Sequence, residues 1–322
     1  MSKKRAERIP LIIILGPTAV GKTKLSLQLA EMLNGEIISA DSRLFYLGMD
    51  IGTAKPSRED LDRVPHHLID VSPPDQTWSL AVYLRQVRRT VRNIHRRGKL
   101  AFLVGGTGQY IRAVVEGWRL PEVKPDPALR QAIRDWAEQI GVKGLRERLA
   151  ELDPEAADRI DGPNLRRMIR ALEVIFLSGE RFSEQQGKTG SPFDILQIGL
   201  IRPREDLYRR IDQRLEEMLD QGLIAEVKSL LEAGYSPDLP AMSAIGYKQI
   251  IHYLQGVITR EEAVRQIASK SRKYVRQQAN WFQADDPEIH WFHPEQVSAA
   301  ELADFIRKSL KQADNFTDKE NR

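Results

Sequence analysis

The sequence contains no cysteine and no long hydrophobic run. Without cysteine it has no disulfide, no thiolate ligand for zinc and no cysteine nucleophile. The apolar stretch at residues 9–15 is far shorter than the roughly 20 residues that a membrane-spanning helix needs. The basic residues 3–5 are interpreted as a solvated tail and not as part of a signal peptide. We therefore expect a cytoplasmic protein without membrane segments, whose chemistry depends on oxygen and nitrogen groups.

The sequence also has little excess charge of either sign. Its 49 basic and 45 acidic side chains give a net charge of +4 over 322 residues. That total identifies no partner, because a phosphate backbone responds to local clusters of positive charge. The length suggests about two domains at roughly 150 residues each.

Short strands alternate with helical patterns along most of the chain. Apolar, β-branched runs at residues 11–15, 36–40, 100–104 and 195–201 are typical of buried parallel strands, and residues 289–292 are expected to add a last strand. This pattern predicts an α/β fold, a parallel sheet with helices on both faces. Residues 120–186 are rich in proline and helical in pattern, which predicts an inserted helical domain. We expect the core at residues 1–118 and 195–314, the insertion at 119–194 and a polar tail at 315–322.

A phosphate-binding loop follows the first strand and precedes a helical run. The sequence GPTAVGKT matches the phosphate-loop pattern at all defined positions, and its neighbours supply the required strand and helix. Backbone amides of such a loop hold a di- or triphosphate, the lysine reaches its outer oxygens and the threonine can hold Mg²⁺. The alternative is a glycine-rich turn without a ligand. The predicted phosphate-binding residues are Gly16, Pro17, Thr18, Ala19, Val20, Gly21, Lys22 and Thr23.

Polar side chains follow two other strands of the predicted sheet. Asp41 and Ser42 come after residues 36–40, and Thr107 comes after residues 100–104. A carboxylate at this edge can bind Mg²⁺ or act as a general base. The alternatives are a helix-capping aspartate and a tight turn that binds nothing.

Basic residues gather in three places. The helical pattern at residues 80–97 carries regularly spaced arginines, which are interpreted as a solvated face. Arg166, Arg167 and Arg170 adjoin apolar residues, and residues 272–276 lead into Trp281 and Phe282. Basic groups beside aromatics suit phosphate contact and base stacking, although core packing is the commoner role of such aromatics. The two histidines at residues 66–67 lie in a segment without a second cluster of metal-ligating residues, so no zinc site is expected.

Seven ordered motifs together resemble the bacterial tRNA dimethylallyltransferases over residues 11–291. They are the phosphate loop, Asp41-Ser42 followed by Tyr46, GMDIGTAKP at residues 48–56, VPHHLID at 64–70, LVGGTG at 103–108, RALEV at 170–174 and AIGY at 244–247.

The resemblance implies transfer of a dimethylallyl group from its diphosphate to N6 of the adenine that follows the tRNA anticodon. Amides, Lys22, Mg²⁺ on Thr23 and the cation Arg214 would then neutralise the leaving diphosphate, with help from Thr18. Asp41 would accept the N6 proton. The target adenine must leave the anticodon-loop stack.

The resemblance also implies a set of contacts with the tRNA anticodon stem-loop. Several positions depart from the family pattern, among them Leu44, Ser243, Gln277 and Gln283, where other residues are common, and these departures would alter individual contacts. We expect a monomer; the competing functions are a small-molecule phosphate-loop kinase and a non-catalytic RNA-binding protein. The implied tRNA-binding residues are Asp41, Ser42, Arg43, Leu44, Thr107, Arg130, Arg166, Arg167, Arg170, Gly246, Tyr247, Lys248, Arg276 and Trp281.

Overall fold

A computed structural model describes residues 8–320, with side chains described as far as residue 312. The chain forms two compact units: unit 1 comprises Met1–Ala113 and Pro192–Arg322, and unit 2 is Val114–Ser191. Unit 2 begins and ends a few residues before the insertion expected at 119–194. The basic tail at residues 3–5 and the last residues of the expected polar tail, 321–322, lie outside the described residues.

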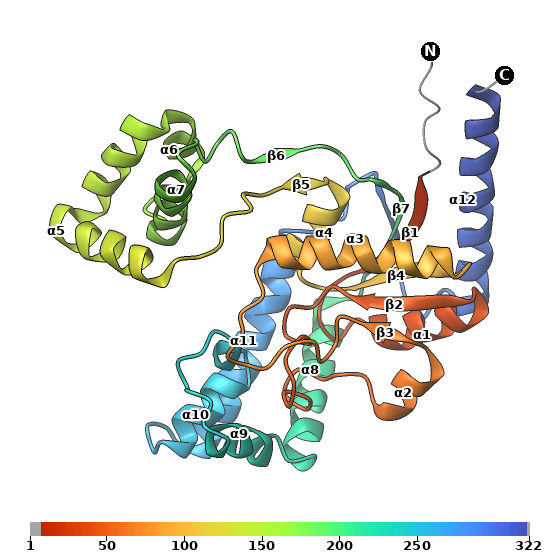
Figure 1. The fold of residues 1–322 in the computed structure, drawn as a ribbon. Coiled ribbons are helices and arrows are strands. Elements are labelled where there is room, and N and C mark those ends of the chain that lie inside the picture. The colour runs from red at the N-terminus through yellow and green to blue at the C-terminus, as the bar shows by residue number, and fades with distance from the viewer. Residues whose placement is uncertain (1–7, 321–322) are drawn as a thin grey trace. The chain divides into compact units, whose positions relative to one another are not determined.

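Unit 1 is built on a six-stranded sheet whose order is β3-β2-β4-β1-β7-β8 (Figure 1). All neighbouring strands are parallel; Ile12 of β1, for example, is in register with Phe102 of β4 and Leu196 of β7. This arrangement confirms the predicted α/β class and its parallel sheet. The strands are β1 (Ile9–Leu15), β2 (Gly35–Ser39), β3 (His66–His67), β4 (Leu100–Gly105), β7 (Phe193–Leu200) and β8 (Ile289–Phe292).

Helices cover both faces of this sheet. Helices α1 and α12 pack together on one face, and α3 packs against β1, β2 and β4 from the other. Helices α8 and α11 lie side by side, and α10 packs against both α9 and α11. The helices of unit 1 are α1 (Lys22–Met32), α2 (Arg58–Arg63), α3 (Leu80–Arg96), α4 (Gly108–Val115, which ends in unit 2), α8 (Arg204–Asp220), α9 (Leu223–Glu232), α10 (Tyr247–Leu254), α11 (Arg260–Ala279) and α12 (Ala299–Glu320), with a 3₁₀ turn, η1 (Ala241–Ser243).

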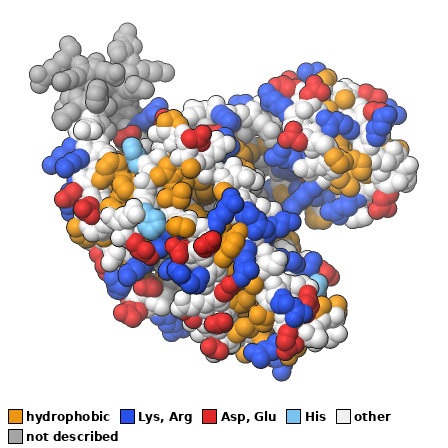
Figure 2. Space-filling view, turned by 180° about the vertical axis from the view of Figure 1, so that it is seen from behind, with side chains coloured by type: hydrophobic (Ala, Val, Ile, Leu, Met, Phe, Trp, Pro, Cys, Tyr) orange, Lys and Arg blue, Asp and Glu red, His pale blue; other side chains and the backbone are white. Residues whose placement is uncertain are grey.

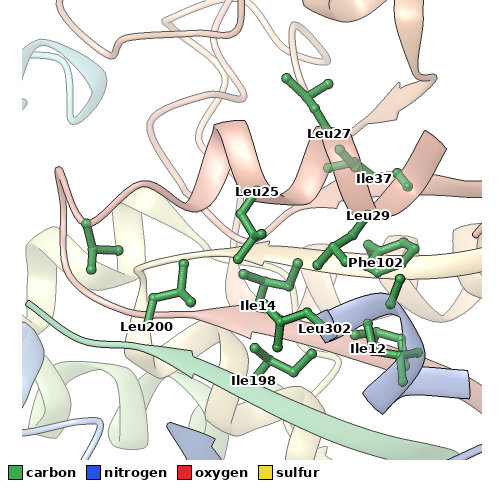
Figure 3. Close-up of a cluster of buried hydrophobic side chains, with 14 of the residues drawn as sticks. Ile12, Ile14, Leu25, Leu27, Leu29, Ile37, Phe102, Ile198, Leu200 and Leu302 are labelled. Atoms are coloured by element: carbon green, nitrogen blue, oxygen red, sulfur yellow. The ribbon is translucent and has the colours of Figure 1, made fainter. Parts of the chain in front are cut away.

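The core between α1 and the sheet explains why β1 is apolar without alternation. Residues 11–15 of β1 are completely buried because helices cover the strand on both sides. Figure 3 shows Ile12 and Ile14 of β1 beside Leu25 and Leu29 of α1, with Leu302 of α12 next to them. This packing holds α1 against the sheet, and residues 16–21 of the phosphate loop connect β1 to α1.

One predicted helix is in fact two. The apolar spacing of residues 204–232 predicts a continuous helix, but α8 ends at Asp220 and α9 begins at Leu223. Gly222 lies between them with φ of +100°, a left-handed conformation that glycine adopts without steric cost. The break turns α9 away from α8 and places Glu226 against the loop that follows β2. At the other end of the chain, α12 runs through residues 315–320, where we expected a tail.

Unit 2 is mainly helical. Its helices are α5 (Pro127–Leu152), α6 (Pro154–Arg159) and α7 (Leu165–Ser178), and its short hairpin pairs β5 (Trp118–Arg119) with β6 (Gly187–Lys188). Helix α5 is interrupted at Gly141, where φ is +75°, and packs on α7 around buried residues such as Ile133, Leu149 and Leu172. Unit 2 therefore has a hydrophobic core of its own. In the part of the chain that the structure describes, no helix is long and apolar enough to span a membrane.

Candidate active site

A cavity of about 780 Å³ lies at the carboxyl ends of the strands in unit 1. Open parallel sheets bind ligands at this edge, and the volume suits a substrate-sized ligand. Thr18 and Lys22 of the phosphate loop, Asp41 after β2 and Arg214 of α8 all line it. The structure thus brings together the side chains that the sequence singled out for catalysis. Other predicted residues in its wall are Ala19, Gly21, Thr23, Ser42, Arg43, Leu44 and Gly246.

The phosphate loop has the backbone that its glycines permit. Gly21 has φ of +110° and directly precedes α1, and a Cβ added at Gly16 would come within 2.6 Å of the Leu200 carbonyl oxygen. Ala19 also has a positive φ of 66°. Two arginines that the sequence analysis missed hold this shape: Arg210 donates from Nε to the Ala19 carbonyl at 2.7 Å, and Arg202 donates to the Val20 carbonyl at 3.0 Å.

Lys22 folds back onto its own loop. Its Nζ donates to the carbonyl oxygens of Gly16 at 3.0 Å and Pro17 at 2.8 Å. Burial lowers the pKa of Lys22 to about 8; Asp41 opposes this shift and Arg214 adds to it. An incoming anion would favour the ammonium form, so Lys22 is suited to neutralise phosphate charge.

Asp41 begins a turn and caps no helix, which makes the capping alternative wrong. Its carboxylate Oδ1 accepts from the Arg43 backbone N–H at 3.0 Å, and its own N–H donates to the Ser39 hydroxyl at 3.1 Å. The next helix, α2, begins only at residue 58. The two bonds hold the Asp41 side chain at the cavity wall, where a base would have to lie.

Arg214 projects from α8 into the same cavity. Burial lowers its pKa, whereas Asp41 raises it, and an arginine remains charged in proteins. One guanidinium nitrogen lies 3.5 Å from the Ala54 carbonyl oxygen. Lys22 and Arg214 are thus two of the cationic side chains in the cavity wall, which they share with the carboxylate of Asp41.

Arg43 ties the turn after β2 to the segment around η1. Its guanidinium donates to the carbonyl oxygens of Pro240 at 3.0 Å and Ala241 at 3.4 Å, and to the Ser243 hydroxyl at 3.4 Å. Arg43 and Ser243 are 200 residues apart in sequence, yet they share this part of the cavity wall. The guanidinium of Arg43 therefore places a positive charge next to Ser243.

Glu226 of α9 organises the loop at residues 50–54. Its carboxylate accepts from three consecutive backbone N–H groups, those of Asp50 at 2.9 Å, Ile51 at 2.7 Å and Gly52 at 3.1 Å. The Tyr247 hydroxyl adds a fourth bond at 2.5 Å. Residues 52–54 line the cavity, so Glu226 supports its wall from behind.

A buried amide joins two loops of the site. Gln278 of α11 accepts from the Thr18 backbone N–H and donates to the Gly106 carbonyl, both at 2.9 Å. Nearby, burial raises the pKa of Tyr274 to about 12, with Asp41 contributing, while hydrogen bonds with Thr107 and Gln278 oppose the rise. No individual role in the site was predicted for Gln278 or Tyr274.

The remaining predicted residues of unit 1 lie outside the cavity lining. Thr107 is adjacent, because its hydroxyl accepts from the Ser42 backbone N–H at 3.5 Å. Tyr247 is completely buried with its hydroxyl bound to Glu226, so its side chain offers no atom to RNA here. Lys248 and Arg276 are exposed. Figure 2 shows Lys and Arg side chains grouped on one face of unit 1.

The two aromatic residues after α11 have different environments. Phe282 is 8% exposed and belongs to the interior, whereas Trp281 is 40% exposed. A Cβ added at Gly108 would overlap the Trp281 side chain, so the ring lies directly on the start of α4. The core interpretation thus holds for Phe282, and the ring of Trp281 is partly available for stacking.

The arginines of unit 2 fall into two groups. Arg130 binds both carboxylate oxygens of Glu173, at 2.8 and 3.0 Å, and Arg170 donates to Glu173 at 2.6 Å and to the Val123 carbonyl at 2.8 Å. Glu173 is completely buried. Arg166 and Arg167, in contrast, are exposed. Arg130 and Arg170 therefore stabilise unit 2, whereas the side chains of Arg166 and Arg167 are available to a partner.

The phosphate loop offers one residue suited to holding a metal ion together with a phosphate. Among the residues that the structure describes, no group of three or more His, Asp or Glu side chains could hold a metal ion. His67 instead bonds the Glu36 carboxylate at 2.7 Å. Thr23, in the first turn of α1, lines the cavity beside Lys22 and is the residue that could help to bind a phosphate-bound cation.

Comparisons with known proteins agree with this geometry. The family model described as IPP transferase matches residues 44–285. The chain is 42% identical over 307 residues to the tRNA dimethylallyltransferase of Thermomicrobium roseum, covering 95% of this chain and 93% of the relative. This chain belongs to the IPP transferase family. A second relative, from Roseiflexus, is 50% identical over 274 residues, or 85% of this chain and 90% of the relative.

Solved structures of the family share the fold. The full-length tRNA isopentenylpyrophosphate transferase of Bacillus halodurans superposes with a TM-score of 0.72 at 41% identity, covering 96% of this chain and 99% of that one. A eukaryotic dimethylallyltransferase acting on tRNA gives a TM-score of 0.76 at 27% identity, covering 88% and 73% of the two chains. The sheet with its phosphate loop is therefore the fold of this transferase family.

Proposed function

We propose that this protein is a tRNA dimethylallyltransferase, which transfers a dimethylallyl group from dimethylallyl diphosphate to N6 of the adenine 3′ of the anticodon. One observation carries the proposal: the carboxylate of Asp41 shares a single cavity with the phosphate loop and two cations, Lys22 and Arg214. The relatives named as tRNA dimethylallyltransferases at 42% and 50% identity support the same activity.

The residues account for each part of the reaction. The N6 nitrogen attacks C1 of the dimethylallyl group, the C1–O bond breaks, and the diphosphate leaves with the bonding electron pair. Lys22, Arg214 and the amides at the start of α1 neutralise the negative charge that develops on the diphosphate. Asp41 accepts the proton that N6 loses when the new C–N bond forms. Thr18 faces the cavity from the loop and can donate to the diphosphate.

Mg²⁺ would complement these cations. A diphosphate carries more negative charge than Lys22 and Arg214 together provide, and Thr23 stands where a phosphate-loop hydroxyl holds the ion. When bound, the ion would neutralise leaving-group charge. The tRNA would approach by its anticodon stem-loop, with Arg43 at the cavity and the exposed Arg166 and Arg167 of unit 2 offering phosphate contacts.

The direct test is transfer of radiolabel from dimethylallyl diphosphate to tRNA in the presence of Mg²⁺. We expect label in the tRNA with the wild-type protein, at least ~100-fold slower transfer with Asp41→Asn, and normal transfer with the control Asp62→Asn, an exposed residue of α2. Tight tRNA binding without any transfer would favour an RNA-binding protein. Transfer of the γ-phosphate of ATP to an acceptor, with dimethylallyl diphosphate left intact, would instead favour a kinase.

A further inference from the structure

Gln278 connects the two sides of the candidate active site through one buried side chain. It lies in the last turn of α11 and is only 3% exposed. Its amide oxygen accepts from Thr18 N–H in the phosphate loop, and its amide nitrogen donates to the carbonyl of Gly106, each at 2.9 Å. The two loops follow the adjacent strands β1 and β4 and also approach each other directly, since a Cβ added at Gly106 would lie 3.1 Å from the Gly16 carbonyl oxygen.

The contact requires a glutamine on one side and a glycine on the other. A primary amide supplies a donor and an acceptor from the same planar group, and glutamine carries it on a side chain long enough to reach both loops. A Cβ at Gly106 would overlap the Gln278 amide nitrogen, so any larger residue there displaces the amide. Both loops are thus built around this side chain.

The two bonds connect groups with different roles in the proposed reaction. Because Gln278 binds the Thr18 N–H, that amide is held by the protein and the side chain of Thr18 faces the cavity from a fixed backbone. Gly106 adjoins Thr107, whose hydroxyl accepts from Ser42 next to the base Asp41. Gln278 therefore joins the diphosphate side to the side that receives the acceptor nitrogen.

We infer that Gln278 is a positioning residue that sets the separation between the leaving diphosphate and the attacking N6. The inference rests on the proposed transferase function. Nucleophilic substitution at C1 depends steeply on the distance and alignment of the reacting atoms, and a misplacement of about 1 Å can lower the rate ~100-fold. Loss of the Gln278 bridge should thus lower kcat while each substrate still binds.

The test uses two variants that break the bridge from opposite ends. Gln278→Met keeps the size and helix preference of the side chain but removes its hydrogen bonds to both loops and the one with Tyr274. Gly106→Ala displaces the amide without changing it, and its Cβ would also lie 3.1 Å from the Gly16 carbonyl oxygen. Gln266→Met is the matched control, since it makes the same exchange in the same helix where the side chain bonds only Glu262 in the structure. Kinetics are measured well below the melting temperature of each variant, so that a loss of stability alone leaves kcat unchanged.

We expect kcat to fall by ~10- to 100-fold in Gln278→Met and in Gly106→Ala, with KM for either substrate within about threefold of wild type. The double variant should be no slower than the slower single variant, because both changes break the same bridge. A kcat for Gln278→Met as high as that of Gln266→Met overturns the inference, as do multiplicative losses in the double variant. If Gln278→Met does not fold, Gly106→Ala decides alone. If the wild-type protein transfers no label, the proposed function fails instead.

Discussion

The support that Glu226 gives to the cavity wall leads to a quantitative prediction for stability. Glu226→Ala removes the acceptor of four hydrogen bonds, those from Asp50, Ile51, Gly52 and Tyr247. A hydrogen bond contributes about 1 kcal/mol net, and more when a buried partner is left unpaired. The Asp50 N–H is exposed and can bind water instead, so we expect the free energy of unfolding to fall by about 3 kcal/mol.

Two milder variants separate the contributions of this network. Tyr247→Phe removes only the bond from the hydroxyl, which should lower the free energy of unfolding by about 1 kcal/mol. Glu226→Gln keeps one acceptor, the amide oxygen, so the free energy of unfolding of this variant should lie between those of Tyr247→Phe and Glu226→Ala. Glu232→Ala is the control, because that residue is exposed in the last turn of the same helix and pairs only with Lys228 in the structure.

Calorimetry and urea unfolding of these variants provide the measurement. For a unit of this size, about 3 kcal/mol corresponds to a melting temperature lower by roughly 6–12 °C. The order of stability should be wild type and Glu232→Ala, then Tyr247→Phe, then Glu226→Gln, then Glu226→Ala. A melting temperature of Glu226→Ala equal to that of Glu232→Ala would refute the idea that this carboxylate supports the loop at residues 50–54.

Three further predictions concern charge. Burial lowers the pKa of Lys22 to about 8, so in the free protein the Lys22 side chain loses its positive charge above that pH. Affinity for dimethylallyl diphosphate should therefore fall by up to about tenfold per pH unit above 8. In calorimetric titrations, the affinity of the Lys22→Arg variant should depend less on pH over the same range. Arg43→Met should raise KM for tRNA several-fold, and adding Ser243→Arg should restore it by returning a guanidinium to the same place; no recovery in steady-state assays would count against this arrangement. Binding of tRNA in filter assays should weaken steeply between 50 and 200 mM salt, by about 10³-fold or more if six cations contact phosphates, and a flat profile would contradict the role assigned to the arginines.

The sequence predicted the parts of the fold that are determined locally. Residues 11–15 are apolar at every position, as a strand covered on both faces requires, and the glycines of the phosphate loop permit its turn. The boundary between α8 and α9 could not be predicted in this way, because Leu219, Leu223 and Val227 keep helical spacing across the break. Only the left-handed backbone of Gly222 shows that the chain turns there.

Lys22 was singled out by the phosphate-loop pattern and Asp41 by its place after a strand, whereas the role expected of Arg214 came only from the resemblance to the family. The site was not predictable where a role depends on partners that are distant in the sequence. Gln278 is an ordinary amide until Thr18, 260 residues earlier, is placed beside it. Likewise, nothing in the sequence around residues 166–173 shows that Arg170 is bound to Glu173 whereas Arg166 is exposed.

The folded-back position of Lys22 has a consequence for turnover. In the free protein its ammonium already has two acceptors, the carbonyl oxygens of Gly16 and Pro17. An anion that binds the loop must compete with them, and an anion that departs leaves no buried charge without partners. In the proposed reaction, the same competition would act on the inorganic diphosphate that remains after the prenyl group has gone. The carbonyl oxygens of Gly16 and Pro17 would thus favour release of the by-product, because Lys22 keeps two partners when the loop is empty.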